Sequence, residues 1–217
     1  FTNDPWPSWV YKFDDRTRLE QSLFVPHGTA ACVIRWRVLT RNKGVSLRIR
    51  PLLSVRNYHN LHHENSSFNF HTDVREGCVS WVPYWGTPAV HIHSAGSYTH
   101  DPLWYRSFLY SIEQERGLDA VEDLASPGEL TFVLDEKNKS TRADAWMILS
   151  TDTPGSDELP KGTARQIGEA LASQELTRRS ALGTGLVRSA DTYIVRRSLA
   201  SSVIAGYPWF TDWGRDT

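Results

Sequence analysis

The closing run AGYPWFTDWGRDT (205–217) holds the side chains whose types and spacing best suit chemistry. It combines aromatic rings with two carboxylates and one guanidinium, namely Trp209, Phe210, Asp212, Trp213, Arg215 and Asp216. An aromatic ring can stack on the apolar face of a sugar, while an arginine donates hydrogen bonds to hydroxyls and an aspartate accepts them. The run therefore suits sugar binding. The alternative is a structural turn in which Arg215 and Asp216 form an ion pair, and composition alone favours that turn.

A second candidate is the histidine-rich stretch RNYHNLHHENSSFNFH (56–71). Its histidines and Glu64 are possible metal ligands, since imidazole commonly binds metals. No pair four residues apart is securely on a helix, however, and we predict no metal site. We favour a polar, hydrogen-bonded edge formed by Arg56, Tyr58, His59 and Asn60, with His59 as a candidate binding residue. Ordinary loop residues with satisfied hydrogen bonds are the alternative.

The chain also contains nine tryptophans, which can fill a core or offer a flat platform to a ligand. In WVPYWGTPAVHIH (81–93), Trp81, Tyr84 and Trp85 stand beside a glycine and two prolines. We favour core and interdomain packing for these rings over a sugar-stacking platform. Trp6 and Trp9 have the same two interpretations, and a core role is again favoured.

The elements that must position these groups are mostly strands between residues 8 and 150. In CVIRWRVL (32–39), Trp36 and Val38 fall on one face of a pleated segment, and Arg35 and Arg37 fall on the other. Similar alternation recurs along the chain, separated by turn signals such as PHG, RNKG and SPGE. Many short strands of this kind predict an antiparallel sandwich. The charged second face is expected to be wet or covered by another domain.

The sequence changes character after residue 150. STDTPGSDELPKGT (150–163) is rich in turn-forming residues and predicts a linker. A helix is expected over 164–182, ending in Arg178 and Arg179 before Gly183, and a second helix over 185–200. We therefore divide the chain into a β domain (1–150), a linker with a helix (151–184) and the start of an α-helical domain (185–217).

Composition excludes several classes of partner. With 24 basic and 25 acidic residues the formal net charge is −1, which gives no field for nucleic acid or an anionic membrane. No apolar stretch of about 18 residues is present, so no membrane partner is expected. Cys32 and Cys78 form no zinc-type spacing, and a reducing cytoplasm is compatible with them.

Several of these segments together are similar to one protein family. IAGYPWFTDWGRDT (204–217) resembles the signature that opens the catalytic domain of glycogen debranching enzymes of the amylo-alpha-1,6-glucosidase family. Four upstream segments resemble the N-terminal domain of that family in the same order: WPSWVYKF, LEQSLFVPHG, LRIRPLLSVRNYHNLHHEN and SADTYIV. The terminal motif is long and specific, whereas the upstream pieces are persuasive only together.

The resemblance implies a mainly β fold: an antiparallel β super-sandwich followed by linker helices and the start of an (α/α)6 toroid. It implies that Arg215 and Asp216 hold the terminal glucose, with Trp213 beside it, and that no cofactor is needed. Trp209, Asp212 and His59 complete the expected substrate-binding set. The implied partner is a branched alpha-glucan such as glycogen, limit dextrin or malto-oligosaccharides. The implied reaction is hydrolysis of alpha-1,6-glucosidic branch linkages with release of glucose.

The acid and the base of that reaction are expected beyond residue 217. Carboxyl groups of inverting glycosidases stand roughly 6.5–9.5 Å apart. Asp212 and Asp216 are four positions apart, and on a helix they would share a face and lie too close. We therefore assign no catalytic residue within the chain and expect it to be inactive alone. Two alternatives stay open: another glucoamylase- or trehalase-like glycosidase, and a non-catalytic glucan-binding module.

Overall fold

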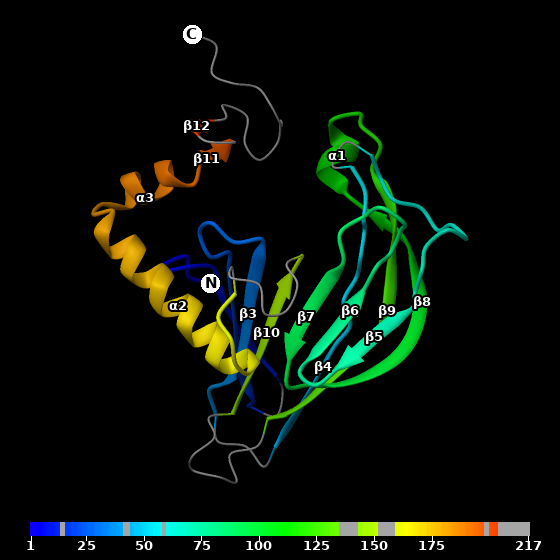
Figure 1. Ribbon diagram of the computed structural model, residues 1–217, viewed down its shortest axis with the longest axis horizontal. Helices are drawn as coiled ribbons and strands as arrows, with labels where there is room; N and C mark the ends of the chain where they lie inside the picture. The colour runs from blue at the N-terminus through cyan, green and yellow to red at the C-terminus, as the bar shows by residue number, and fades with distance from the viewer. Residues whose placement is uncertain are drawn as a thin grey trace. The chain divides into compact units, whose positions relative to one another are not determined.

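The structure is a computed structural model that describes residues 1–13, 16–40, 44–57, 60–134, 143–151, 159–197 and 200–203 (Figure 1). The side chains of residues 195–197 and 200 are outside this description. Of the residues that the structure describes, 45% lie in strands and 17% in helices, and the sheets are antiparallel, so the fold is mainly β. These features confirm the predicted class. The chain divides into two compact units, Phe1–Leu171 and Ala172–Thr217.

The first unit contains a sheet of seven antiparallel strands in the order β1-β2-β3-β10-β7-β6-β5. Its strands are β1 (Ser8–Lys12), β2 (Arg18–Phe24), β3 (Ala31–Val38), β5 (Thr72–Arg75), β6 (Cys78–Trp81), β7 (Val90–Ser94) and β10 (Asp144–Ser150). β10 lies between β3 and β7, so the last strand of the unit joins two parts of the sheet that form earlier in the chain.

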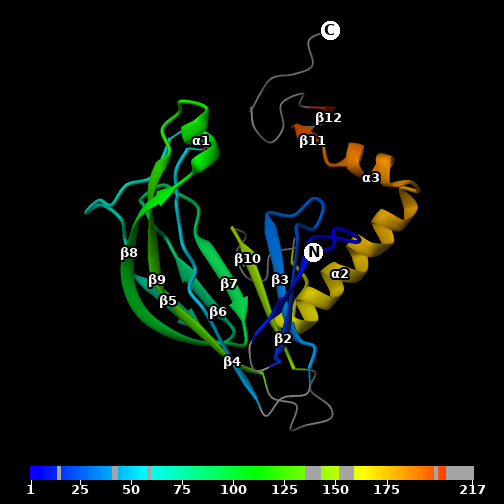
Figure 2. The same ribbon diagram turned by 180° about the vertical axis from the view of Figure 1, so that it is seen from behind.

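A second sheet has three strands in the order β4-β9-β8, again antiparallel. Its strands are β4 (Val45–Ile49), β8 (Ser97–Leu109) and β9 (Val121–Leu134), and the short helix α1 (Ser111–Glu115) connects the last two. Figures 1 and 2 show β8 and β9 as long, curved ribbons beside the shorter β5 and β6. The segment from residue 50 to 71 that joins β4 to β5 forms no strand in its described part.

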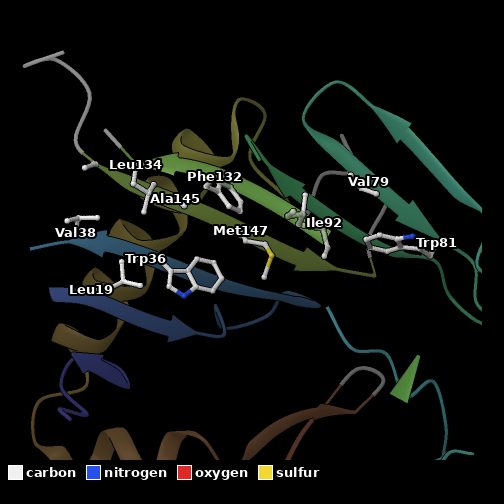
Figure 3. Close-up of a cluster of buried hydrophobic side chains, with 12 residues drawn as sticks. Leu19, Trp36, Val38, Val79, Trp81, Ile92, Phe132, Leu134, Ala145 and Met147 are labelled. Atoms are coloured by element: carbon white, nitrogen blue, oxygen red, sulfur yellow. The ribbon is translucent and has the colours of Figure 1, made fainter. Parts of the chain in front are cut away.

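The two sheets pack face to face through one apolar cluster (Figure 3). Leu130, Phe132 and Leu134 come from alternate positions of β9 and meet side chains of the large sheet. Those partners are Leu19, Trp36, Val38, Val79, Trp81, Ile92, Ala143, Ala145 and Met147. Trp36 and Val38, which alternate with arginines in the sequence, therefore lie on the inward face of β3.

The outward face of β3 and β10 is covered by the first half of helix α2 (Ala164–Ala181). Gly168 lies so close to the indole of Trp146 that a Cβ at this position would overlap the ring. Ile167 and Leu171, on the same helix, are buried. The charged face of the sheet was expected to be wet or covered by another domain, and over β3 and β10 this half of α2 is what covers it. The helix itself matches the prediction for 164–182.

The second unit contains helix α3 (Gly185–Asp191) and a hairpin of β11 (Ile194–Arg197) and β12 (Ala200–Val203). Thr184 caps α3 by accepting a hydrogen bond from the Val187 N–H at 3.5 Å. The predicted helix over 185–200 is wrong beyond Asp191. The run from Thr192 to Val195 is β-branched and aromatic, which favours an extended backbone over a helix.

Gly183 ends the preceding helix in a left-handed conformation (φ 73°), as its position after Arg178 and Arg179 predicts. The division into residues 1–150, 151–184 and 185–217 stays a prediction, and so does the start of a toroid, since 204–217 lie outside the described residues.

Candidate functional site

The predicted sugar-binding residues of the closing run all lie outside the described residues. They are Trp209, Asp212, Trp213, Arg215 and Asp216. His59, from the histidine-rich stretch, also lies outside them. Their roles stay predictions. The structure does describe residues on both sides of His59, and these take part in a connected polar network.

This network is built around Glu122 near the start of β9. Its side chain is 1% exposed. Arg56 forms an ion pair with it through Nε, and the Tyr110 hydroxyl donates to it at 2.5 Å. The backbone N–H of His62 donates to Oε1 at 3.1 Å. One buried carboxylate thus connects the loop before His59, the loop after it and the end of β8.

The electrostatics of Glu122 follow from these contacts. Burial alone would raise its pKa, but the hydrogen bonds from Arg56, Tyr110 and the His62 N–H outweigh burial and hold the pKa below its ordinary value. The same contact raises the pKa of Tyr110, chiefly because its hydroxyl donates to the carboxylate. Glu122 is therefore an anionic anchor, and a role as proton donor does not suit it.

His62 is the second anchor, and both of its ring nitrogens are engaged. Nδ1 lies 3.1 Å from the carbonyl oxygen of Asp123, and Nε2 lies 2.7 Å from the Tyr84 hydroxyl. Burial lowers the pKa of His62, which favours the neutral ring. Because a carbonyl can only accept, Nδ1 carries the proton and Nε2 accepts from Tyr84. Asn65 in turn donates to the Tyr84 oxygen at 2.8 Å.

Asp123 anchors the next part of the loop. Its carboxylate accepts from the backbone N–H of Glu64 at 3.0 Å and from that of Ser107 at 2.9 Å. These two hydrogen bonds lower the pKa of Asp123. Glu64 also forms an exposed ion pair with Arg106 of β8. Sequence reasoning singled out neither Glu122 nor Asp123, although two adjacent acidic residues inside an apolar strand were the available signal.

Aromatic rings pack against two members of this network, His62 and Tyr84. His62 lies 5.3 Å from Trp104 and 5.9 Å from Phe68 between ring centroids, and Phe68 contacts Tyr84 edge to face. Phe68 also belongs, with Leu53 and Ala125, to a second and smaller apolar cluster, separate from the main core. Tyr84 thus packs as favoured in the sequence, and Trp81 is 1% exposed in the main core.

The other tryptophans divide between packing and exposure. Trp6 stacks on Phe24 with centroids 4.3 Å apart, and Trp9 lies 5.4 Å from Phe1. Trp85, in contrast, is 101% exposed, so it does not pack in the core of the described chain.

The described histidines do not converge on a metal site. Within the described ranges, no three His, Cys, Asp or Glu side chains are placed to share a metal ion. His62 is accounted for by Asp123 and Tyr84. The described part of the chain also includes no helix with the length and apolar character needed to cross a bilayer.

Comparison with known families gives two matches. Residues 1–141 match the family model described as glycogen debranching enzyme N terminal, which covers more than half of the chain. Residues 188–217 match the family model described as amylo-alpha-1,6-glucosidase. A search of curated proteins finds no match. The second match contains all five predicted sugar-binding residues of the closing run.

Proposed function

Because the chain belongs to the glycogen debranching enzyme family through its N-terminal region, we propose that the full-length protein hydrolyses alpha-1,6-glucosidic branch linkages of glycogen or limit dextrin. The product is free glucose. One observation carries the proposal: the N-terminal match and the amylo-alpha-1,6-glucosidase match follow each other in one chain. The substrate is then a branched alpha-glucan, and malto-oligosaccharides share its chemistry.

In this proposal the closing run binds the terminal glucose. Arg215 donates to sugar hydroxyls through its fork of N–H groups, and Asp216 accepts from them. Trp213 offers its ring to the apolar face of the sugar, with Trp209 and Asp212 beside it. The general acid and general base lie beyond residue 217, and acid/base hydrolysis of this kind needs no cofactor.

The β domain supports this site as a super-sandwich that precedes an (α/α)6 toroid. Arg56 and His62, on either side of His59, are fixed to Glu122. The anchoring of these two flanking residues supports His59 as a residue that contacts the catalytic domain or the glucan, because flanking segments that are already held lose less entropy on binding. We place the enzyme in the cytoplasm, where the free thiols of Cys32 and Cys78 are stable.

The test is glucose release from a branched limit dextrin by the full-length protein and its Asp216→Asn variant. Loss of a charge-assisted hydrogen bond to substrate predicts a fall in kcat/KM of about tenfold or more. Asp119→Asn is the matched control, since Asp119 is exposed on the connection between α1 and β9. Circular dichroism of each variant checks that the fold is intact.

Two results would contradict the proposal in different ways. A folded full-length protein that releases no glucose removes the debranching activity and leaves another glycosidic linkage or a binding module. Equal activity of the Asp216→Asn variant and the parent removes the role of Asp216 alone.

A further inference from the structure

A cavity of about 430 Å³ opens on the outward face of the large sheet, over β5, β6 and β7. This volume is within the ~300–1,000 Å³ range of small-molecule sites. The lining residues Asp73, Ser80 and His91 project from the face opposite to that of Val79 and Ile92, which enter the main core, and Trp81 of the core also lines the cavity. The cavity belongs to the first compact unit alone, and none of its lining residues takes part in the Glu122 network.

The floor of the cavity is a row of polar side chains that crosses neighbouring strands. Asp73 of β5 pairs in register with Ser80 of β6, and Ser80 pairs with His91 of β7. Side chains at register partners project from the same face of a sheet. The Ser80 hydroxyl lies 2.7 Å from His91 Nδ1, so the row is linked by a hydrogen bond.

The rim adds further polar groups without a strong charge of one sign. Asp73 and Arg75 form an ion pair at 2.8 Å and their charges offset each other, which leaves Glu76 as the one unbalanced formal charge among the acidic and basic lining residues. Asn69 and His71 stand on the approach to β5 and line the same cavity. A mixture of hydrogen-bond donors and acceptors suits a neutral ligand that is rich in hydroxyls. A phosphate or a charged peptide would instead need a strong excess of the opposite charge among the lining residues.

Trp85 stands in the loop that borders this cavity. The loop joins β6 to β7, and its first and last residues, Val82 and Ala89, both line the cavity. It is an ordered turn, because the Thr87 hydroxyl donates to the Tyr84 carbonyl at 2.8 Å and Gly86 takes φ 80°. The indole is fully exposed at 101%. The turn thus presents an indole to solvent while its two ends line a polar cavity, and an exposed indole offers an apolar face on which a sugar ring can stack.

We propose that this cavity, together with Trp85, binds a linear segment of alpha-1,4-linked glucan, separately from the closing run. The choice of glucan among neutral polyols rests on the proposed function. The ring of Trp85 stacks on one glucose unit, while Asp73, Ser80 and Asn69 offer partners to hydroxyls of the chain. Such a site holds the outer chains of a branched substrate without contacting the bond that is cleaved.

The test is calorimetric titration of the full-length protein with maltoheptaose, comparing Trp85→Ala, Trp85→Phe and the parent. A stacked ring contributes about 1 kcal/mol or more, so the alanine variant should bind at least about fivefold more weakly at one site. The phenylalanine variant keeps a ring and should retain most of the affinity. Tyr11→Ala is the matched control, since Tyr11 is a 44% exposed aromatic on β1, at the opposite edge of the sheet.

A second readout separates this site from the catalytic one. Hydrolysis of a small branched oligosaccharide should be unchanged in Trp85→Ala. The inference is overturned if maltoheptaose binds Trp85→Ala as tightly as the parent, whatever the hydrolytic activity. If the parent releases no glucose but loses maltoheptaose affinity on Trp85→Ala, the proposed reaction is wrong and the glucan site stands.

Discussion

Arg35 Nη2 lies 2.6 Å from Oδ2 of Asp144, across the β3–β10 pair of the large sheet. The carboxylate is fully buried, and its other oxygen pairs with Arg165 of α2. The Trp146 indole N–H donates to the same group at 3.2 Å, and Arg35 lies over the Trp146 ring at 4.7 Å. Asp144 therefore connects the sheet to the helix that covers it, through ion pairs with Arg35 of β3 and Arg165 of α2.

Replacing Asp144 by alanine should destabilise the chain by about 3 kcal/mol, since removing one partner of a buried ion pair leaves the others without compensation. The estimate is at the lower end of the usual range because Arg35 and Arg165 are 20% and 32% exposed. Urea unfolding measures the loss. Asp119→Ala, an exposed control, should change stability by less than about 0.5 kcal/mol. A loss below about 1 kcal/mol for Asp144→Ala would show that the ion pairs of Asp144 are not needed for stability.

Gly168→Ala should destabilise the chain although alanine is the better helix former. The new methyl group would overlap the Trp146 ring, and overpacking costs about 1–3 kcal/mol against a gain of about 1 kcal/mol in helix propensity. Thermal unfolding should show a lower Tm. Gly185→Ala is the control, since no heavy atom lies within 4 Å of a Cβ there. An equal response at the two positions would contradict close packing of α2 on the sheet.

Glu122→Gln should cost about 2–4 kcal/mol of unfolding free energy, because Arg56 then faces a neutral amide in a buried place. Hydrogen exchange at the backbone N–H of His62, which donates to Glu122, should become faster. Glu64→Gln removes only an exposed pair with Arg106 and should cost less than about 1 kcal/mol. Unchanged exchange at His62 would mean that the loop is held by its aromatic contacts alone.

Acid should destabilise the chain in two stages. Burial lowers the pKa of His62 and His93 in the folded chain. As the pH falls, these two rings are therefore protonated in the unfolded chain before they are protonated in the folded one, and the free energy of unfolding decreases below about pH 6.5. Hydrogen bonds lower the pKa of Glu122 and Asp123, so the stability they contribute is lost only as the pH falls further, below about 4.5. Scans of Tm between pH 7.5 and 5.5 test the first stage. His93→Gln should flatten this dependence, because it removes one of the two histidines whose pKa burial lowers.

The sequence predicted those strands that have one apolar and one polar face. Trp36 and Val38 alternate with arginines because one side of β3 meets the core. β8 escaped prediction because it is an edge strand whose residues are mostly exposed, which leaves no period of two to detect. The helix expected over 185–200 failed where local β preference outweighed a weak apolar spacing.

The polar network was harder to predict than the strands. His62 was noticed as one of several histidines, but its partners Glu122 and Tyr84 are far from it in sequence, and only the packing of the loop on β9 brings them together. Arg56 was expected to belong to a polar, hydrogen-bonded edge, but its pairing with Glu122 was not foreseen. Pairwise ionic contacts between distant segments leave no periodic trace, which is why pattern reasoning missed them.

Strand β9 contributes to both apolar clusters and to the network around Glu122. Leu130 and Phe132 belong to the main core, Ala125 to the smaller one, and Glu122 to the polar anchor, all on one continuous ribbon. These three groups of contacts cannot unfold independently of one another, because each of them requires β9 to remain an extended strand. Denaturation of the sandwich should accordingly be a single cooperative transition, in which the loop beside His59 is lost together with the core and not before it.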